Sequence, residues 1–305
     1  MMESVIRLKT LNVKRDSALQ AIFYMILSAI CFSVVELTGR QLVRDVSTYQ
    51  LVWIRYAVHL LFMVVVLGPR YKTRLVRTSR LPLQITRSLT MLGMPLFFIM
   101  AVTAMPANDV WSVYWLSPLI ALGFSVLVLR EPVGRLFWVI GGLGFGAMLL
   151  IFRIDSGALS LASLFAVGMG ACLSLHLTLS RILREDHPFT SLFHTALWVF
   201  IPLSFVMPFV WTPPSFTSLV GMVIIGLVGA LGLYALARSG ELVPLPIVAS
   251  FAYSEALWTL LLNLILFGIL PGIRTIVGVA VICGITLYQF AYVYRQRAAA
   301  AREPA

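Results

Sequence analysis

The chain has 305 residues, of which 60% are hydrophobic and only 11% are charged. An average soluble protein carries about 25% charged residues, so this composition excludes a soluble globular protein. The net charge of +11 comes from basic residues between apolar runs, which favours contact with anionic membrane lipid over a nucleic-acid partner.

Ten apolar runs are long enough to cross the hydrocarbon layer of a membrane as helices. The loops between them are short and leave no room for a soluble domain. Because barrel strands alternate between polar and apolar residues, continuous apolar runs also exclude a β-barrel. We therefore expect an all-α integral membrane protein with spans over residues 18–40, 48–68, 83–104, 107–129, 134–153, 158–180, 190–210, 215–237, 245–269 and 273–294.

The distribution of Lys and Arg predicts that both ends of the chain face the cytoplasm. With this orientation, 17 of the 23 Lys and Arg residues fall in cytoplasmic segments and four fall in the outer loops. Residues 1–17 and 295–305 are then cytoplasmic tails. The first apolar run is long and ends in charged residues rather than at a small-residue cleavage site, which favours a retained span over a secretory signal.

The chain contains an internal repeat with an offset of 138 residues. Five spans in each copy require the second copy to be inverted, as in many secondary carriers. The predicted organisation is a first five-helix repeat over residues 18–153 and a second over residues 158–294. Equivalent pairs under this offset include Pro106 and Pro244, Trp115 and Tyr253, and Ser117 and Glu255.

A carboxylate near the middle of the ninth span is the main candidate for a functional group. If that span begins at about residue 245, Glu255 lies ~15 Å into the membrane, and Ser117 reaches a similar depth from the other repeat. Phe251, Thr259 and Asn263 share its helical face at a spacing of four residues. Glu255 is interpreted as a partner for a substrate amine or as a protonatable coupling group. The alternative is a structural carboxyl bonded to a neighbouring helix.

Charged residues in the first two spans form a second candidate group. Glu36 precedes Arg40 by four residues and can also reach Arg55, so it is either an ion-pair partner or a gate or coupling site. Arg55 and His59 share a helical face and could bind a substrate carboxylate or phosphate. Arg87 lies one turn inside the cytoplasmic boundary and is expected to snorkel to the surface, with a structural role.

Aromatic residues cluster on the two equivalent spans near the middle of the membrane. Rings at mid-depth differ from the usual belts at membrane interfaces and can form a cavity wall that stacks on an organic solute. Simple helix packing is the alternative. The residues of this set are Trp111, Tyr114, Trp115, Phe251, Tyr253 and Trp258.

Pairs of small residues four apart mark the fifth and tenth spans. They are Gly142 with Gly146, and Ala280 with Gly284. Such pairs allow helices to approach closely. They predict contact between these two spans or a homodimer formed through them.

A recurring motif is similar to that of a known family. The pattern A-x-P-A, then P-x-x-A-L, then L-x-E, followed by a glycine-rich span, resembles the EamA-type transporters of the drug/metabolite transporter superfamily. The second copy departs from it, with Ala256 in place of proline and Ile269 in place of glutamate. The resemblance covers about residues 18 to 294 and implies a carrier of amino acids, their derivatives, vitamins or other small metabolites. The first copy matches at Ala104, Pro106, Ala107, Pro118, Ala121 and Glu131, with Arg55 and Arg87 in the preceding spans.

We therefore expect a secondary-active transporter in a bacterial-type inner membrane that moves a small polar or amphipathic metabolite by alternating access. An amino acid, an amino-acid derivative or a heterocyclic vitamin such as a flavin suits the predicted cavity. No P-loop motif is present, so a proton or a counter-substrate is the expected driver. An intramembrane enzyme and a passive channel are the alternatives. The chain has no H-E-x-x-H motif and no paired aspartates at mid-depth, so we expect no catalytic residue, metal or cofactor.

Overall fold

The computed structural model of the protein describes residues 15–152 and 161–300, with side chains over 19–152 and 161–291. Most of the predicted N-terminal tail, the end of the predicted C-terminal tail and the junction between the predicted repeats lie outside the described residues. They comprise residues 1–14, 301–305 and 153–160.

The described part of the chain is helical and contains no strand. Ten candidate membrane spans are present, and their bounds lie within a few residues of the predicted ones for most spans, which confirms the predicted all-α membrane fold. The second span continues past α2 through a π-helical turn and two short helical segments. The α-helices are α1 (Arg15–Leu42), α2 (Thr48–Phe62), α3 (Gly68–Tyr71), α4 (Leu81–Val102), α5 (Ala107–Tyr114), α6 (Ser117–Leu127), α7 (Arg135–Phe152), α8 (Ser163–Ile182), α9 (Pro188–Val210), α10 (Phe216–Leu242), α11 (Leu245–Phe251), α12 (Glu255–Phe267) and α13 (Ile273–Ala300).

The fourth and ninth spans are each broken near the middle, at equivalent positions of the repeat. In the fourth span α5 ends at Tyr114 and α6 begins at Ser117. Pro118 has no N–H to donate to the carbonyl of Tyr114, so an α-helix cannot run through this point unchanged. In the ninth span a 3-10 turn over Ala252–Ser254 joins α11 to α12, and Ala256 stands where the proline would be. The second segments thus begin at Ser117 and Glu255, residues that the offset of 138 pairs.

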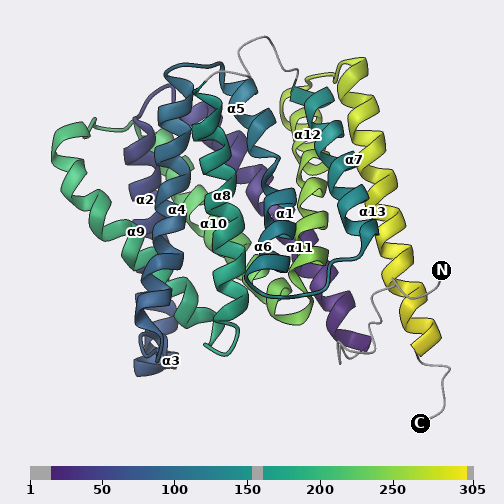
Figure 1. The fold of residues 1–305 in the computed structure, drawn as a ribbon. Coiled ribbons are helices and arrows are strands. Elements are labelled where there is room, and N and C mark those ends of the chain that lie inside the picture. Colours follow the sequence, from purple (N-terminus) through teal and green to yellow (C-terminus); the bar gives the residue numbers. More distant parts are fainter. Residues whose placement is uncertain (1–14, 153–160, 301–305) are drawn as a thin grey trace.

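The helices pack in pairs that can be compared under the offset of 138 residues. In Figure 1, α5 lies above α6 whereas α11 lies below α12, so the two broken spans run in opposite directions. Helix α1 packs along α10 and α4 packs along α8, which are equivalent pairs under the offset. Helix α2 packs on its own equivalent α9, and α7 packs on α13. The inverted repeats and the orientation of the chain in the membrane stay predictions.

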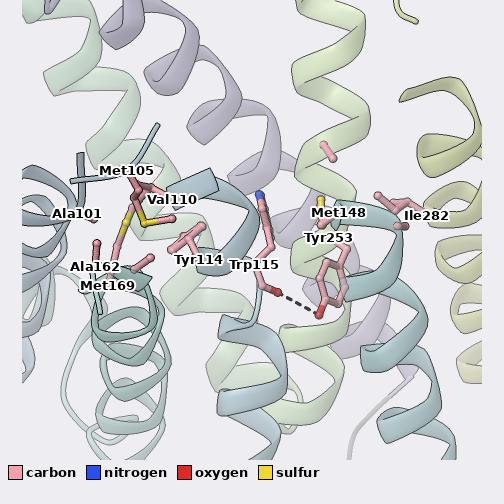
Figure 2. Close-up of a cluster of buried hydrophobic side chains, with 13 residues drawn as sticks. Ala101, Met105, Val110, Tyr114, Trp115, Met148, Ala162, Met169, Tyr253 and Ile282 are labelled. Atoms are coloured by element: carbon pink, nitrogen blue, oxygen red, sulfur yellow. Dashed lines mark hydrogen bonds between the residues drawn. The ribbon is translucent and has the colours of Figure 1, made fainter. Parts of the chain in front are cut away.

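The two breaks meet at one pair of aromatic residues. Trp115 follows α5, and its repeat equivalent Tyr253 lies in the 3-10 turn before α12; their ring centroids are 6.0 Å apart. Figure 2 shows the Tyr253 hydroxyl pointing at the backbone carbonyl of Trp115. It donates hydrogen bonds to this oxygen over 3.4 Å and to the carbonyl of Gly141 over 3.1 Å. A residue in contact with its own equivalent is expected where a two-fold axis passes.

Helix α13 approaches α7 closely at Gly278, which is not one of the predicted residues. A Cβ added at Gly142, Gly146 or Gly284 would meet no atom of a neighbouring helix within 4 Å, because these positions face away from the bundle. The close approaches occur at Gly144, against the ring of Tyr253, and at Gly278, against α7. The prediction that Gly142 and Gly146 join the fifth span to the tenth is therefore wrong, whereas a homodimer through these outward faces stays a prediction.

Substituting Gly144 by Ala should destabilise the protein. A Cβ at Gly144 would lie 2.5 Å from ring carbons of Tyr253, whose hydroxyl is held by two carbonyls. Overpacking of this kind typically costs about 1–3 kcal/mol. We expect a lower midpoint of thermal unfolding in detergent for Gly144→Ala than for the matched control Gly142→Ala. Equal midpoints for the two variants would contradict the packing described here.

Candidate functional site

A cavity of about 250 Å³ lies between helices of the two halves. In the first half the wall comes from α1, α2, α4 and α5. In the second half it comes from α8, α10, α11, α12 and the 3-10 turn between α11 and α12. The lining residues are Met25, Ser28, Ala29, Phe32, Val35, Glu36, Val52, Arg55, Tyr56, Met91, Met94, Pro95, Phe98, Trp111, Tyr114, Met169, Leu173, Leu177, Leu233, Leu236, Val248, Ala252 and Glu255.

The break in the ninth span places Glu255 at the wall of this cavity. Glu255 is the first residue of α12, where a carboxylate is favoured by the helix dipole. Its backbone carbonyl accepts a hydrogen bond of 3.1 Å from the Ser33 hydroxyl of α1. Its carboxylate has no hydrogen-bond or ion-pair partner in the described part of the chain. The side chain is therefore available to a ligand or a proton.

Glu36 lies close to Glu255 and is linked to it through two hydroxyls. Thr259 Oγ1 lies 3.3 Å from Glu36 Oε2 and 3.0 Å from Ser33 Oγ, and Ser33 Oγ donates to the backbone of Glu255. Because the Ser33 proton is used in this way, the Thr259 hydroxyl donates either to Ser33 or to Glu36. Glu36 also pairs with Arg40, so of the two predicted partners the structure joins it to Arg40 and not to Arg55.

Arg55 supplies positive charge to the same cavity. Its guanidinium carbon lies 5.4 Å from the centroid of the Tyr56 ring, a cation–π arrangement. Among the described residues Arg55 has no ion pair and no hydrogen bond from its side chain. The cavity thus contains one guanidinium and one carboxylate that no other group of the described chain neutralises.

The rest of the wall is mainly apolar, with four methionines and several aromatic rings. Methionine side chains are flexible and polarizable and adapt to irregular ligand shapes. The sequence analysis did not select the methionines, although the lining positions show helical spacing once the cavity is known. On α1 the lining positions recur every three or four residues from Met25 to Glu36, and on α4 they include Met91, Met94 and Phe98.

Five of the thirteen predicted site residues line the cavity, namely Glu36, Arg55, Trp111, Tyr114 and Glu255. Thr259 contacts Glu36, and the Asn263 side chain donates to the backbone carbonyl of Thr259. The structure does not place the remaining six among the lining residues. These are His59, Trp115, Ser117, Phe251, Tyr253 and Trp258.

Most of these six are buried among other helices. Phe251 belongs to an apolar cluster with α1 and α6 residues, because the 3-10 turn separates it from the face that carries Glu255, Thr259 and Asn263. The predicted four-residue stripe is therefore wrong for Phe251. His59 is buried beside Tyr56, Ser117 accepts a hydrogen bond from Ser174 through its backbone, and Trp258 is partly buried.

A comparison with known proteins finds a family match for the part of the chain predicted as the first repeat. Residues 19–153 match the model of the EamA-like transporter family. Over these residues the chain is similar to the proteins of that family. The family is part of the drug/metabolite transporter superfamily, and together with the ten apolar helices it supports a membrane transporter. A search of curated proteins gave no match.

The fold of both halves is shared with a solved structure. One of them, titled "Crystal structure of protein", superposes with a TM-score of 0.75 at 14% sequence identity. The match covers 89% of this chain and 95% of the other. At this identity the likeness shows the fold alone.

Arg87, one of the residues that resembles the EamA-type pattern, is buried rather than snorkelled. Only 2% of the residue is exposed. Its guanidinium donates to the Ser180 hydroxyl over 3.2 Å, to the Thr195 hydroxyl over 2.7 Å and to the backbone carbonyl of Ser191. Neighbouring helices close over Arg87 before it can reach the surface, so the predicted snorkelling is wrong. Its contacts join α4 to α8 and α9.

Replacing Arg87 by Gln should destabilise this three-helix contact. The substitution removes hydrogen bonds from a charged donor, each typically worth about 1.5–3 kcal/mol, and leaves buried acceptors without partners. Arg77→Gln is the control, because Arg77 is exposed and precedes the same helix. We expect a lower midpoint of thermal unfolding for Arg87→Gln alone, measured in detergent. A midpoint equal to that of the control would show that these bonds contribute nothing.

Proposed function

We propose that this protein is a secondary-active transporter for a small zwitterion with an apolar side chain, such as an amino acid or its derivative. The observation that carries this proposal is the presence of Arg55 and Glu255, both without a neutralising partner, in one cavity. Unpaired charges inside a membrane are costly. A zwitterion that places its carboxylate on Arg55 and its ammonium beside Glu255 offsets the cost of both charges.

The size and the lining of the cavity favour this class of substrate. A volume of about 250 Å³ is just below the roughly 300–1,000 Å³ of pockets for drug-sized ligands. An amino acid is more compatible with this volume than a flavin. The wall of Met91, Met94, Met169 and Phe98 would contact the apolar part of the substrate.

Alternating access is supported by the position of the cavity between the halves. Helices of both halves contribute to the wall, and both broken spans reach it. In carriers built from inverted repeats, rocking of one half against the other exposes such a site to each side in turn. We place this transport in a bacterial-type inner membrane.

Two carboxylates in one cavity also suggest a coupling mechanism. Glu36 and Glu255 repel each other while both are charged, and a proton on one of them removes this repulsion. A proton can therefore accompany or exchange for the substrate, with Glu255 as the first choice because its carboxylate has no partner in the described chain.

The test of transport is counterflow of radiolabelled solute in proteoliposomes, with a panel of amino acids, nucleoside derivatives and vitamins. Saturable counterflow of one chemical class is the expected result. Flux that does not saturate and shows no trans-stimulation would favour a passive channel, and conversion of the solute would favour an intramembrane enzyme.

Arg55→Gln should weaken counterflow of the identified amino acid. Loss of a charge-assisted hydrogen bond, about 1.5–3 kcal/mol, corresponds to roughly a 10- to 100-fold rise in the half-saturating concentration. Arg77→Gln, at an exposed position, should leave this concentration unchanged. An unchanged half-saturating concentration for Arg55→Gln would show that the guanidinium does not bind the substrate.

Glu255→Gln should separate transport from the proton gradient. Because glutamine cannot take up or release the coupling proton, accumulation driven by a pH gradient should disappear while exchange of solute persists. The control is Glu185→Gln, whose carboxylate is 75% exposed outside the spans. Accumulation by Glu255→Gln that equals that of the control would contradict coupling through this residue.

A further inference from the structure

One end of the bundle is held together by an ion pair that lies outside the cavity. Arg181 near the end of α8 donates from Nε to Glu131 Oε1 over 3.0 Å, and the side chains are only 10% and 16% exposed. Glu131 follows α6, and its second oxygen accepts from the backbone N–H of Leu245 at the start of α11 over 3.2 Å. Arg181 also donates to the carbonyl of Gly240 near the end of α10 over 2.8 Å. We name Glu131, Arg181 and these backbone partners the clasp.

A single layer of aliphatic side chains separates the clasp from the cavity. Leu177, Leu233, Leu236 and Val248 line the cavity on one side. The same four residues line a space of only about 10 Å³ whose wall also contains Arg181. Such a volume is at the lower limit for one water molecule. The space between the four aliphatic side chains and Arg181 is therefore too small for an organic solute in this conformation.

We propose that the clasp is the lock of a gate, and that the four aliphatic residues are the gate it holds shut. The elements that carry them are α8, α10 and α11, and the clasp joins these three to the end of α6. Breaking the ion pair frees α8, which carries Leu177, from the end of α6 and, through Glu131, from α11, which carries Val248. The aliphatic layer then separates and the cavity opens toward the clasp. This inference rests on the proposed alternating access.

The opposite end of the bundle has no equivalent of the clasp among the described residues. Under the offset of 138, Glu131 corresponds to Ile269 and Arg181 corresponds to Val43. Neither can form an ion pair. In the described ranges, ion pairs between the two halves occur at the clasp end, whereas the Glu36–Arg40 pair at the opposite end lies within α1.

The experiment measures access to a cysteine in the gate. Leu236 is replaced by Cys after Cys31, Cys172 and Cys283, the three native cysteines, have been changed to Ala. A membrane-impermeant thiol reagent is then applied to inside-out and right-side-out membrane vesicles. In a background with the clasp intact, we expect slow labelling from the clasp end.

Glu131→Gln should raise the rate of labelling from that end at least fivefold. The control is Glu185→Gln, which breaks the exposed ion pair between Glu185 and Arg80 at the same end of the bundle. A rate for Glu131→Gln no greater than that of the control would overturn the proposal. Should Glu131→Gln fail to fold, Arg181→Gln carries the same test with the same expected result.

The outcome is independent of whether a substrate has been found. Labelling requires no transport, so faster labelling in a protein that exchanges no solute would support the gate and overturn the proposed function. Unchanged labelling in a protein that shows saturable counterflow would overturn the gate and leave the proposed function standing.

Discussion

The fold depends on one constraint: inside a membrane a backbone polar group must find its partner within the protein. A helix can be interrupted there only where other helices surround the interruption. Here two spans are interrupted, and neighbouring side chains bond to the backbone at both places. Ser174 of α8 donates to the carbonyl of Ser117, Ser33 of α1 donates to that of Glu255, and Tyr253 donates to that of Trp115. The two interruptions thus support each other as well as the helices around them.

Buried charges in the bundle fall into two groups that differ in their partners. Arg87 donates to three acceptors and holds three helices together, so its charge belongs to the framework. Arg55 and Glu255 face the cavity and have no such partners in the described chain. A charge that the fold leaves unneutralised is retained at a cost in stability, and this contrast distinguishes the cavity from the other polar contacts of the bundle.

The sequence predicts the ten spans well because the length of an apolar run is set directly by the thickness of the membrane. It also places Glu255, because an acidic residue within such a run is rare. The breaks are harder to predict: Pro118 indicates the first, but nothing in residues 252–254 indicates the second except the repeat itself. Spacing alone selects Gly142 and Gly146, whereas the structure uses Gly144, because spacing does not reveal which face meets a neighbour. The burial of Arg87 likewise depends on helices that are distant in the sequence.

Unequal closure of the two ends has a consequence for how the transporter would meet its substrate. The Glu131–Arg181 ion pair joins the halves at one end, whereas the equivalent positions at the other end, Ile269 and Val43, are apolar, and this difference favours one of the two conformations in the empty protein. Solute on the side to which the favoured conformation opens can bind most of the protein molecules. Solute on the other side can bind only the few molecules in the rare conformation. Its apparent affinity is reduced by the fraction of molecules in that conformation. The same set of binding contacts would then give two different half-saturating concentrations, one for each face of the membrane.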